Sequence, residues 1–236
     1  MTASSTDEPT SITSRTRQGT MPSRIDPMLA SAGSEPFDSP DHIFELMWAG
    51  VRAMAHVRDG HVRLVASNGL DLGPFFPELY IIPGMLKADD AILDGEIVVI
   101  DGEGHPAFEA LRPRLHAAAG GDPASLPAEL MKPRKVEGQL SYQAFDLLWL
   151  DGRDTTRLPL WQRKNMLHNA IRPTAEFAAV DFVNDEGVAF FDAVLHRKLE
   201  GIVAKKKTSV YAAGHRTDDW QEIRALQSGD FVVGGY

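Results

Sequence analysis

Residues 43–68, IFELMWAGVRAMAHVRDGHVRLVASN, contain the clearest structural signal in the chain. Apolar and polar residues alternate on both sides of Asp59-Gly60, and an Asp-Gly pair in this setting is the strongest short-range signal for a β-hairpin. The residues before the hairpin predict a further strand that leads into a tight turn at Gly50. This part of the chain therefore predicts antiparallel β-structure.

The sequence on either side of the hairpin predicts interleaved strands and helices. Tight turns at Asn68-Gly69, at 101–104 and at 151–152 favour antiparallel neighbours. We expect strands at 91–100, 139–150, 177–183, 201–205 and 219–224, and helices near 78–87, 107–119, 159–171 and 186–197. The predicted fold class is α+β, with antiparallel sheets flanked by helices.

The composition is that of an ordinary globular protein. The chain has 236 residues, of which 43% are hydrophobic and 24% charged, enough for one large domain or two small ones. It contains no cysteine, which excludes disulfides and thiol chemistry, and we expect a cytoplasmic location. No apolar run approaches the roughly 18 residues of a membrane span, so no membrane partner is expected. The formal net charge of −9 argues against strong, charge-driven binding to DNA phosphates.

Acidic residues on two predicted strands suit a metal or nucleotide site. Asp94 and Glu96 face the same side of one strand because side chains alternate with a period of two. Glu200 and Lys205 flank another strand, and two carboxylates with a lysine would suit Mg²⁺ and phosphate oxygens. Phe145, on a third strand, could stack on a purine. For each motif alone, the commoner alternative is a structural role in the core or on an exposed strand.

The order and combination of the motifs resemble the adenylation domain of ATP-dependent DNA ligases, in particular the bacterial type associated with double-strand-break repair. The resemblance covers residues 26–236 and rests on FELMWAGVR (44–52), ASNGLDL (66–72), FPEL (76–79), LDGEIVVIDGEGHPAFEAL (93–111), FDLLWLDGRD (145–154), LEGIVAKK (199–206) and TDDWQEIR (217–224). It implies a nucleotidyltransferase (ATP-grasp-like) fold, with ATP and Mg²⁺ as cofactors and nicked or broken DNA as partner.

The resemblance also identifies a missing nucleophile. In the family, the lysine of Lys-x-Asp-Gly attacks the α-phosphate of ATP and forms a covalent lysyl-AMP. Here Met47 stands at the lysine position and Ala49 at the aspartate position, whereas Gly50 and Arg52 are kept. No lysine lies between Met1 and Lys87, so we expect no catalytic residue to be intact.

Other family positions are partly kept. The resemblance assigns nucleotide binding to Glu45, Arg52, Glu96, Phe145, Lys205 and Arg224, and metal binding to Glu96 and Glu200. Ser67 stands where the family commonly has an arginine, and Glu222 where it has a phosphate-binding lysine. Two like charges about 4 Å apart cost roughly 4 kcal/mol at an effective dielectric of 20, so Glu222 is expected to weaken ATP binding.

We expect three segments and one main function. Residues 1–23 predict a disordered Ser/Thr-rich arm, 24–230 the ligase-like domain, and 231–236 the start of a linker to an OB-fold that is absent. The main hypothesis is a degenerate ligase of DNA repair and recombination that cannot form lysyl-AMP. The alternatives are an interaction module that binds DNA ends, a repair partner or an intact ligase, and a nucleotidyltransferase with a relocated nucleophile, for which Lys205 is the best candidate.

Overall fold

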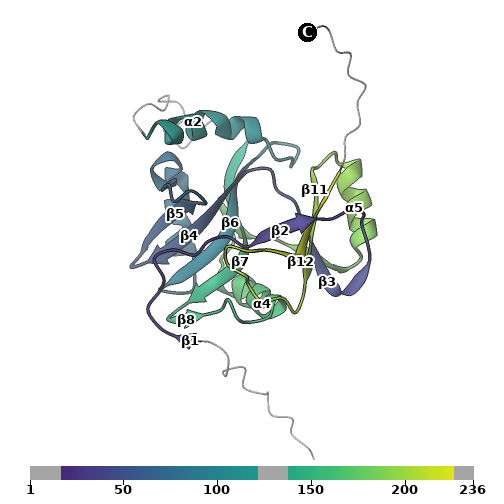
Figure 1. Cartoon of the computed structure of the whole chain (residues 1–236). Coiled ribbons are helices and arrows are strands. Elements are labelled where there is room, and N and C mark those ends of the chain that lie inside the picture. Colours follow the sequence, from purple (N-terminus) through teal and green to yellow (C-terminus); the bar gives the residue numbers. More distant parts are fainter. Residues whose placement is uncertain (1–16, 122–137, 226–236) are drawn as a thin grey trace, which may run out of the picture.

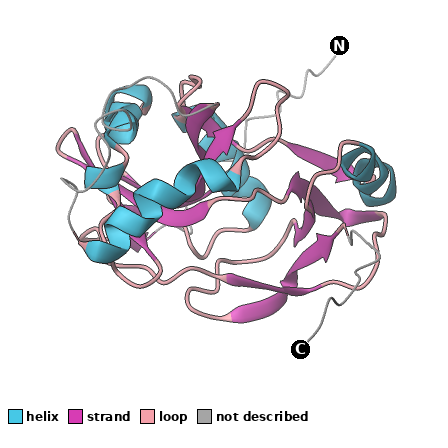
Figure 2. Ribbon diagram, turned by 90° about the horizontal axis from the view of Figure 1, so that it is seen from above, coloured by secondary structure: helices cyan, strands magenta, loops and turns pink. Residues whose placement is uncertain are grey.

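A computed structural model describes residues 17–121 and 138–225, which form two β-sheets with helices on their outer faces (Figures 1 and 2). The expected linker at 231–236 lies outside the described residues, as does the expected arm up to residue 16. The last residues of that arm include strand β1 (Arg17–Gln18), which pairs with β8 (Arg153–Asp154). Within the described residues, no helix is both long enough and apolar enough to cross a membrane.

The first sheet contains the predicted hairpin. Strands β4 (Val51–Arg58) and β5 (His61–Ala66) pair antiparallel, and Arg58 lies opposite His61. Asp59 and Gly60 have φ angles of 50° and 74°, the positive values that a two-residue hairpin turn requires. The hairpin prediction is therefore confirmed. The sheet has the order β1-β8-β7-β6-β4-β5, with β6 at Ala91–Ile100, β7 at Gln139–Leu150 and β9 (Phe177–Ala179) also paired to β7.

The second sheet has five strands in the order β10-β3-β11-β12-β2. Their bounds are β10 Phe182–Asp185, β3 Ser39–Leu46, β11 Gly201–Lys206, β12 Arg216–Arg224 and β2 Leu29–Ala32. Pairing is antiparallel except that β12 runs parallel to β2, as β9 does to β7 in the first sheet. The single strand expected at 177–183 is wrong, because the chain leaves the first sheet after β9 and enters the second at β10.

Helices cover the outer faces of both sheets, as the α+β prediction requires. Helix α4 (Leu160–Ala170) packs on β7, and α5 (Gly187–His196) packs on β3 and β11. Helix α2 (Arg112–Gly120) has a proline in its first turn, which explains why the α-helix begins there and not at residue 107. The other helical segments are short: η1 Gly73–Phe75, η2 Pro77–Ile81, α1 Ile82–Met85 and η3 Phe108–Leu111.

A shared apolar cluster joins the two sheets. It combines Met54 of β4 and Trp149 of β7 with Trp220 of β12 and with Met28, which precedes β2. All four side chains are buried. Because this contact fixes one sheet against the other, the residues that face the space between the sheets are held in a defined arrangement.

Candidate active site

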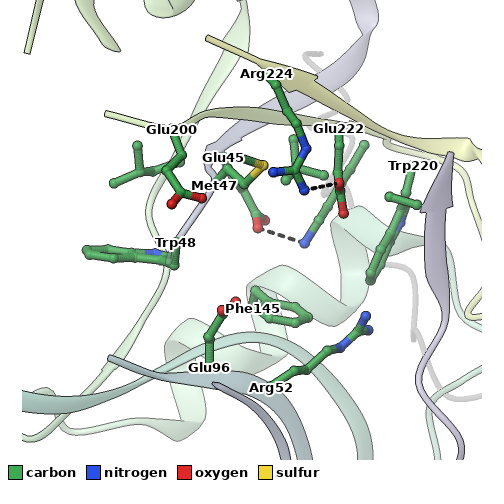
Figure 3. Close-up of a pocket in the computed structure, with 14 residues that line it drawn as sticks. Glu45, Met47, Trp48, Arg52, Glu96, Phe145, Glu200, Trp220, Glu222 and Arg224 are labelled. Atoms are coloured by element: carbon green, nitrogen blue, oxygen red, sulfur yellow. Dashed lines mark hydrogen bonds and ion pairs between the residues drawn. The ribbon is translucent and has the colours of Figure 1, made fainter. Parts of the chain in front are cut away.

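A pocket with a volume of about 260 Å³ lies between the two sheets (Figure 3). It is lined by residues from β2, β3, β4, β6, β7, β11 and β12 and from the segments after β3 and before β11. The structure brings together there the positions singled out from the sequence, namely Glu45, Met47, Arg52, Glu96, Phe145, Glu200, Lys205, Glu222 and Arg224. Ala49 and Ser67 do not line it.

Met47 stands where the chain crosses from the second sheet to the first. Its backbone N–H donates to the Gly201 carbonyl oxygen at 3.0 Å, and its side chain is 7% exposed and points into the pocket (Figure 3). At the other end of the crossing, the Gly50 N–H donates to Glu96 Oε1 at 2.9 Å. A Cβ at position 50 would collide with the Ile97 carbonyl oxygen, so only glycine fits. The crossing is therefore held at both ends.

Glu45 lies at the centre of a buried charge cluster. Its Oε2 accepts from Lys205 Nζ at 2.7 Å, and its Oε1 lies 2.9 Å from Lys164 Nζ. All three side chains are at most 3% exposed. Burial lowers the pKa of Lys205, and the Glu45 carboxylate opposes this shift. Lys164 was missed by sequence reasoning, because one lysine in an otherwise ordinary amphipathic helix gives no signal of burial.

The Phe145 ring is flanked by cations and by a second aromatic side chain. Lys205 Nζ lies 4.4 Å from the ring centroid and Arg52 Cζ lies 5.3 Å from it. The Trp220 ring meets Phe145 edge-on with centroids 6.2 Å apart, and Lys205 Nζ is 4.2 Å from the Trp220 ring. Trp220 was not selected from the sequence, although it lies inside a quoted motif. The apolar part of the pocket is lined by Phe145 and Trp220 together with Ala30, Leu46, Met47, Trp48 and Val203.

Asp94 does not act as a free carboxylate beside Glu96. Arg52 donates to both of its oxygens, at 3.0 and 2.6 Å, and the Tyr211 hydroxyl donates to Oδ2 at 2.6 Å. Asp94 is fully buried, so its oxygens are taken up in holding Arg52. The suggestion that Asp94 and Glu96 together face a metal is therefore wrong for Asp94. Strand alternation gives the shared face, but it does not reveal the arginine.

Glu96 and Glu200 remain as the candidate metal ligands. They lie on opposite sides of the pocket (Figure 3), and the Glu200 charge contributes to raising the pKa of Glu96. Among the described residues, no group of three or more His, Cys, Asp or Glu side chains is placed to hold a metal. Mg²⁺ commonly keeps several waters and uses only one or two carboxylates together with phosphate oxygens, so the pair fits that mode. Their metal role stays a prediction.

Arg224 is paired with Glu222, the position at which the resemblance places a lysine. Its Nη2 donates to Glu222 Oε2 at 2.9 Å, and both side chains line the pocket at its β12 wall (Figure 3). The pair is partly exposed, so it contributes little to stability. It does, however, reduce the availability of the Arg224 guanidinium for a phosphate group. The predicted nucleotide contact of Arg224 is therefore weaker than a free arginine would give.

Glu96 is expected to reduce stability at neutral pH. Burial raises its pKa from 4.5 to about 7, against the opposing Gly50 hydrogen bond. A raised folded-state pKa stabilises the fold below pH 4.5, and this contribution is lost as the pH rises through about 7. At pH 8, Glu96→Gln should therefore unfold at a higher urea concentration than the wild type, with a free energy of unfolding larger by at most about 3 kcal/mol. At pH 4.5, the variant and the wild type should have nearly the same free energy of unfolding. Urea titrations at both pH values measure this.

The exposed Glu103, whose side chain is 84% exposed, provides a matched control for this substitution. Glu103→Gln should change stability by less than about 0.5 kcal/mol at either pH. Equal stabilisation of the Glu96→Gln variant at pH 4.5 and pH 8 would contradict the raised pKa. A confirmed shift would mark Glu96 as a group kept in the pocket at the expense of stability, which is typical of functional sites.

Comparison with known proteins identifies relatives of this arrangement. Residues 27–224 match the family model described as "ATP dependent DNA ligase domain". The chain is 26% identical to the SPbeta prophage-derived DNA ligase-like protein LigB of Bacillus subtilis, over 90% of this chain and 72% of LigB. It is 26% identical to the multifunctional non-homologous end joining protein LigD of Mycolicibacterium smegmatis, over 91% of this chain but only 26% of LigD.

Solved structures show the same similarity. The structure of mycobacterial DNA ligase D complexed with ATP and MES superposes with a TM-score of 0.69 and 27% identity, covering 86% of this chain and 61% of that chain. The ligase domain of Mycobacterium tuberculosis LigD gives a TM-score of 0.65 at 27% identity, covering 84% of this chain and 58% of that chain. This chain thus spans about a quarter of the M. smegmatis LigD protein and somewhat over half of the two solved chains.

Proposed function

The chain belongs to the ATP-dependent DNA ligase family, and from this premise we propose that it keeps the family's adenine pocket without forming the covalent lysyl-adenylate. The proposal rests on Met47, whose thioether points into the pocket and which the resemblance places at the nucleophile position. We further propose that the protein acts in DNA repair as a degenerate ligase that contacts nicked or broken DNA weakly. Its net charge of −9 supports weak contact with DNA phosphates.

The missing step is a substitution at phosphorus. An amine nitrogen forms a bond to the α-phosphorus of ATP, the bond to the bridging oxygen breaks, pyrophosphate leaves, and the nitrogen loses a proton. The Met47 thioether has no N–H and no proton to lose, so it cannot give a neutral phosphoramidate. Ala49 supplies no carboxylate either. The substitutions therefore remove the first step of the family reaction and do not merely slow it.

Lys205 is a poor replacement nucleophile. Among the described residues it is the only lysine that lines the pocket. Burial lowers its pKa, which favours a reactive neutral amine, but its Nζ is bound to Glu45 Oε2 at 2.7 Å. That ion pair stabilises the protonated form, which has no free electron pair for attack. The same nitrogen faces Phe145 and Trp220, so moving it would also break two cation–π contacts.

Incubation with α-³²P-labelled ATP and Mg²⁺, followed by a denaturing gel, tests the proposal directly. We expect no labelled band at the mass of the chain, under conditions in which a family ligase with an intact Lys-x-Asp-Gly motif is labelled. A labelled band would overturn the proposal, and peptide mapping would then locate the nucleophile.

Equilibrium dialysis with adenine compounds tests the retained pocket. We expect reversible binding by the wild type and a roughly tenfold loss in Phe145→Ala, because stacking of a base on an aromatic ring contributes about 1–3 kcal/mol. Phe108→Ala is the matched control, since Phe108 is 40% exposed and lies outside the pocket. No binding of any adenine compound by the wild type would contradict the retained pocket and favour a purely structural interaction module.

A further inference from the structure

The cations that line the pocket are already engaged by the protein's own carboxylates. Arg52 pairs with Asp94 at 2.6 Å, Lys205 with Glu45 at 2.7 Å, and Arg224 with Glu222 at 2.9 Å. Asp94 is fully buried, so Arg52 cannot turn to another anion without leaving that buried charge unpaired. Lys205 could turn only by breaking its own ion pair with Glu45, which Lys164 would still hold. A phosphate group entering the pocket therefore has to compete with a carboxylate for each lining cation.

Two further carboxylates are left over. Glu96 and Glu200 line the pocket, and within the described part of the chain neither forms an ion pair with a lysine, arginine or histidine. The negative charge of Glu200, on the opposite side of the pocket from Glu96, adds to that of Glu222, where the resemblance places a phosphate-binding lysine. The pocket lining thus has four glutamates against three basic side chains, Arg52, Lys205 and Arg224. The electrostatic environment repels a polyanion.

The size and the apolar wall of the pocket fit a small, uncharged ring compound. The volume of about 260 Å³ is below the range of roughly 300–1,000 Å³ that is typical of sites for drug-sized ligands. Phe145 and Trp220 offer aromatic surface to such a ring. An aromatic surface for a base is therefore present, whereas each cation that could face a triphosphate is paired with a carboxylate.

We infer that the pocket selects a phosphate-free adenine compound, such as adenosine, over ATP. This inference rests on the proposed function, because it assumes that the pocket still accepts an adenine ring. It reverses the preference expected of a working ligase, for which the triphosphate is the reactive part of the substrate. The ligand class is thereby narrowed from nucleotides in general to nucleosides and free bases.

Isothermal titration of the whole chain with adenosine, AMP and ATP in EDTA tests the preference. We expect affinity to fall in that order, with ATP at least tenfold weaker than adenosine. The ratio should shrink in 0.5 M salt, since ions screen the repulsion between phosphate and carboxylates. Repeating the titration with Mg²⁺ shows whether a bound cation offsets the excess charge, and we expect adenosine to remain the tighter ligand.

Glu222→Lys provides the diagnostic variant, because it restores the positive charge and releases Arg224 from its partner. We expect it to shift the ATP-to-adenosine affinity ratio at least tenfold towards ATP. Glu103→Lys has the same charge change at an exposed site outside the pocket, and its ratio should match the wild type. If Glu222→Lys fails to fold, the wild-type ratio and its salt dependence decide the question alone.

The outcomes separate this inference from the proposed function. Tighter binding of ATP than of adenosine in EDTA overturns the inference and leaves the retained adenine pocket standing. A ratio that does not change with salt also overturns it, because the discrimination would then not arise from charge. Failure of both adenosine and ATP to bind overturns the proposed pocket and the inference together.

Discussion

Replacement of Glu45 by alanine is expected to lower the free energy of unfolding by about 3–5 kcal/mol, the usual result of removing one partner from a buried ion pair. The variant leaves Lys164 and Lys205 buried without the carboxylate that lies 2.9 and 2.7 Å from their Nζ atoms. For a domain of this length, the midpoint of thermal unfolding should fall by roughly 10 °C. Urea and thermal denaturation monitored by circular dichroism measure both quantities.

The pH dependence of the stability loss in Glu45→Ala tests whether the two buried lysines cause that loss. Burial already lowers the pKa of Lys205 from 10.5 in the wild type, and removal of the Glu45 carboxylate takes away an interaction that raises it. Between the lowered folded-state pKa and 10.5, the unfolded chain binds more protons, so stability increases with pH in that window. The deficit of Glu45→Ala should therefore shrink between pH 7 and pH 10. Glu103→Ala, at an exposed site, should show neither effect, and a deficit that is constant with pH would contradict this account.

Restoring the nucleophile alone should not restore ligation. We expect the double variant Met47→Lys, Ala49→Asp to seal nicked DNA at less than about one-thousandth of the rate of a working family ligase. Removing a single group that stabilises charge in a transition state typically slows a reaction by about 10²–10³. Glu222 and Ser67 still stand at positions where the resemblance places a lysine and an arginine, and Arg224 stays paired with Glu222. A nicked-duplex assay resolved on a denaturing gel measures sealing.

The triple variant, which adds Glu222→Lys, tests this explanation. It should increase covalent labelling by α-³²P-ATP at least tenfold over the double variant, because the introduced lysine replaces repulsion of the triphosphate by attraction. Adding Glu103→Lys instead supplies the same charge change at a remote, exposed site and should leave labelling at the level of the double variant. Robust nick sealing by the double variant would contradict the importance of the phosphate-binding end.

Local patterns predicted the elements whose geometry depends on neighbours in sequence. The hairpin at Asp59-Gly60 and the strands at 91–100 and 139–150 agree with the structure, because turn chemistry and alternation act over a few residues. The prediction of one strand at 177–183 was wrong, since β9 and β10 pair with β7 and β3 in different sheets. No periodicity within those seven residues records which distant strand each half will meet.

Most of the charged residues that line the pocket were predictable from the sequence, whereas Trp220 and the ion pairs between the lining residues were not. Motifs spread from 44 to 224 identified residues that the two sheets bring together. The ion pairs between Lys164 and Glu45 and between Arg52 and Asp94 connect residues far apart in sequence, so no local spacing indicates them. These ion pairs determine which charges are free, and this is why the ligand preference could be inferred only from the structure.

In the crossing between the sheets, main-chain groups hold the path of the chain, whereas side chains determine the chemistry. The segment from Met47 to Gly50 is held through the main-chain N–H groups at its two ends. Those groups are present in every residue except proline, so side chains at positions 47 and 49 can be exchanged while the crossing keeps its path. Such a segment lets an enzyme lineage lose its chemistry in a few mutational steps and still inherit an intact scaffold, on which selection can act for a different task.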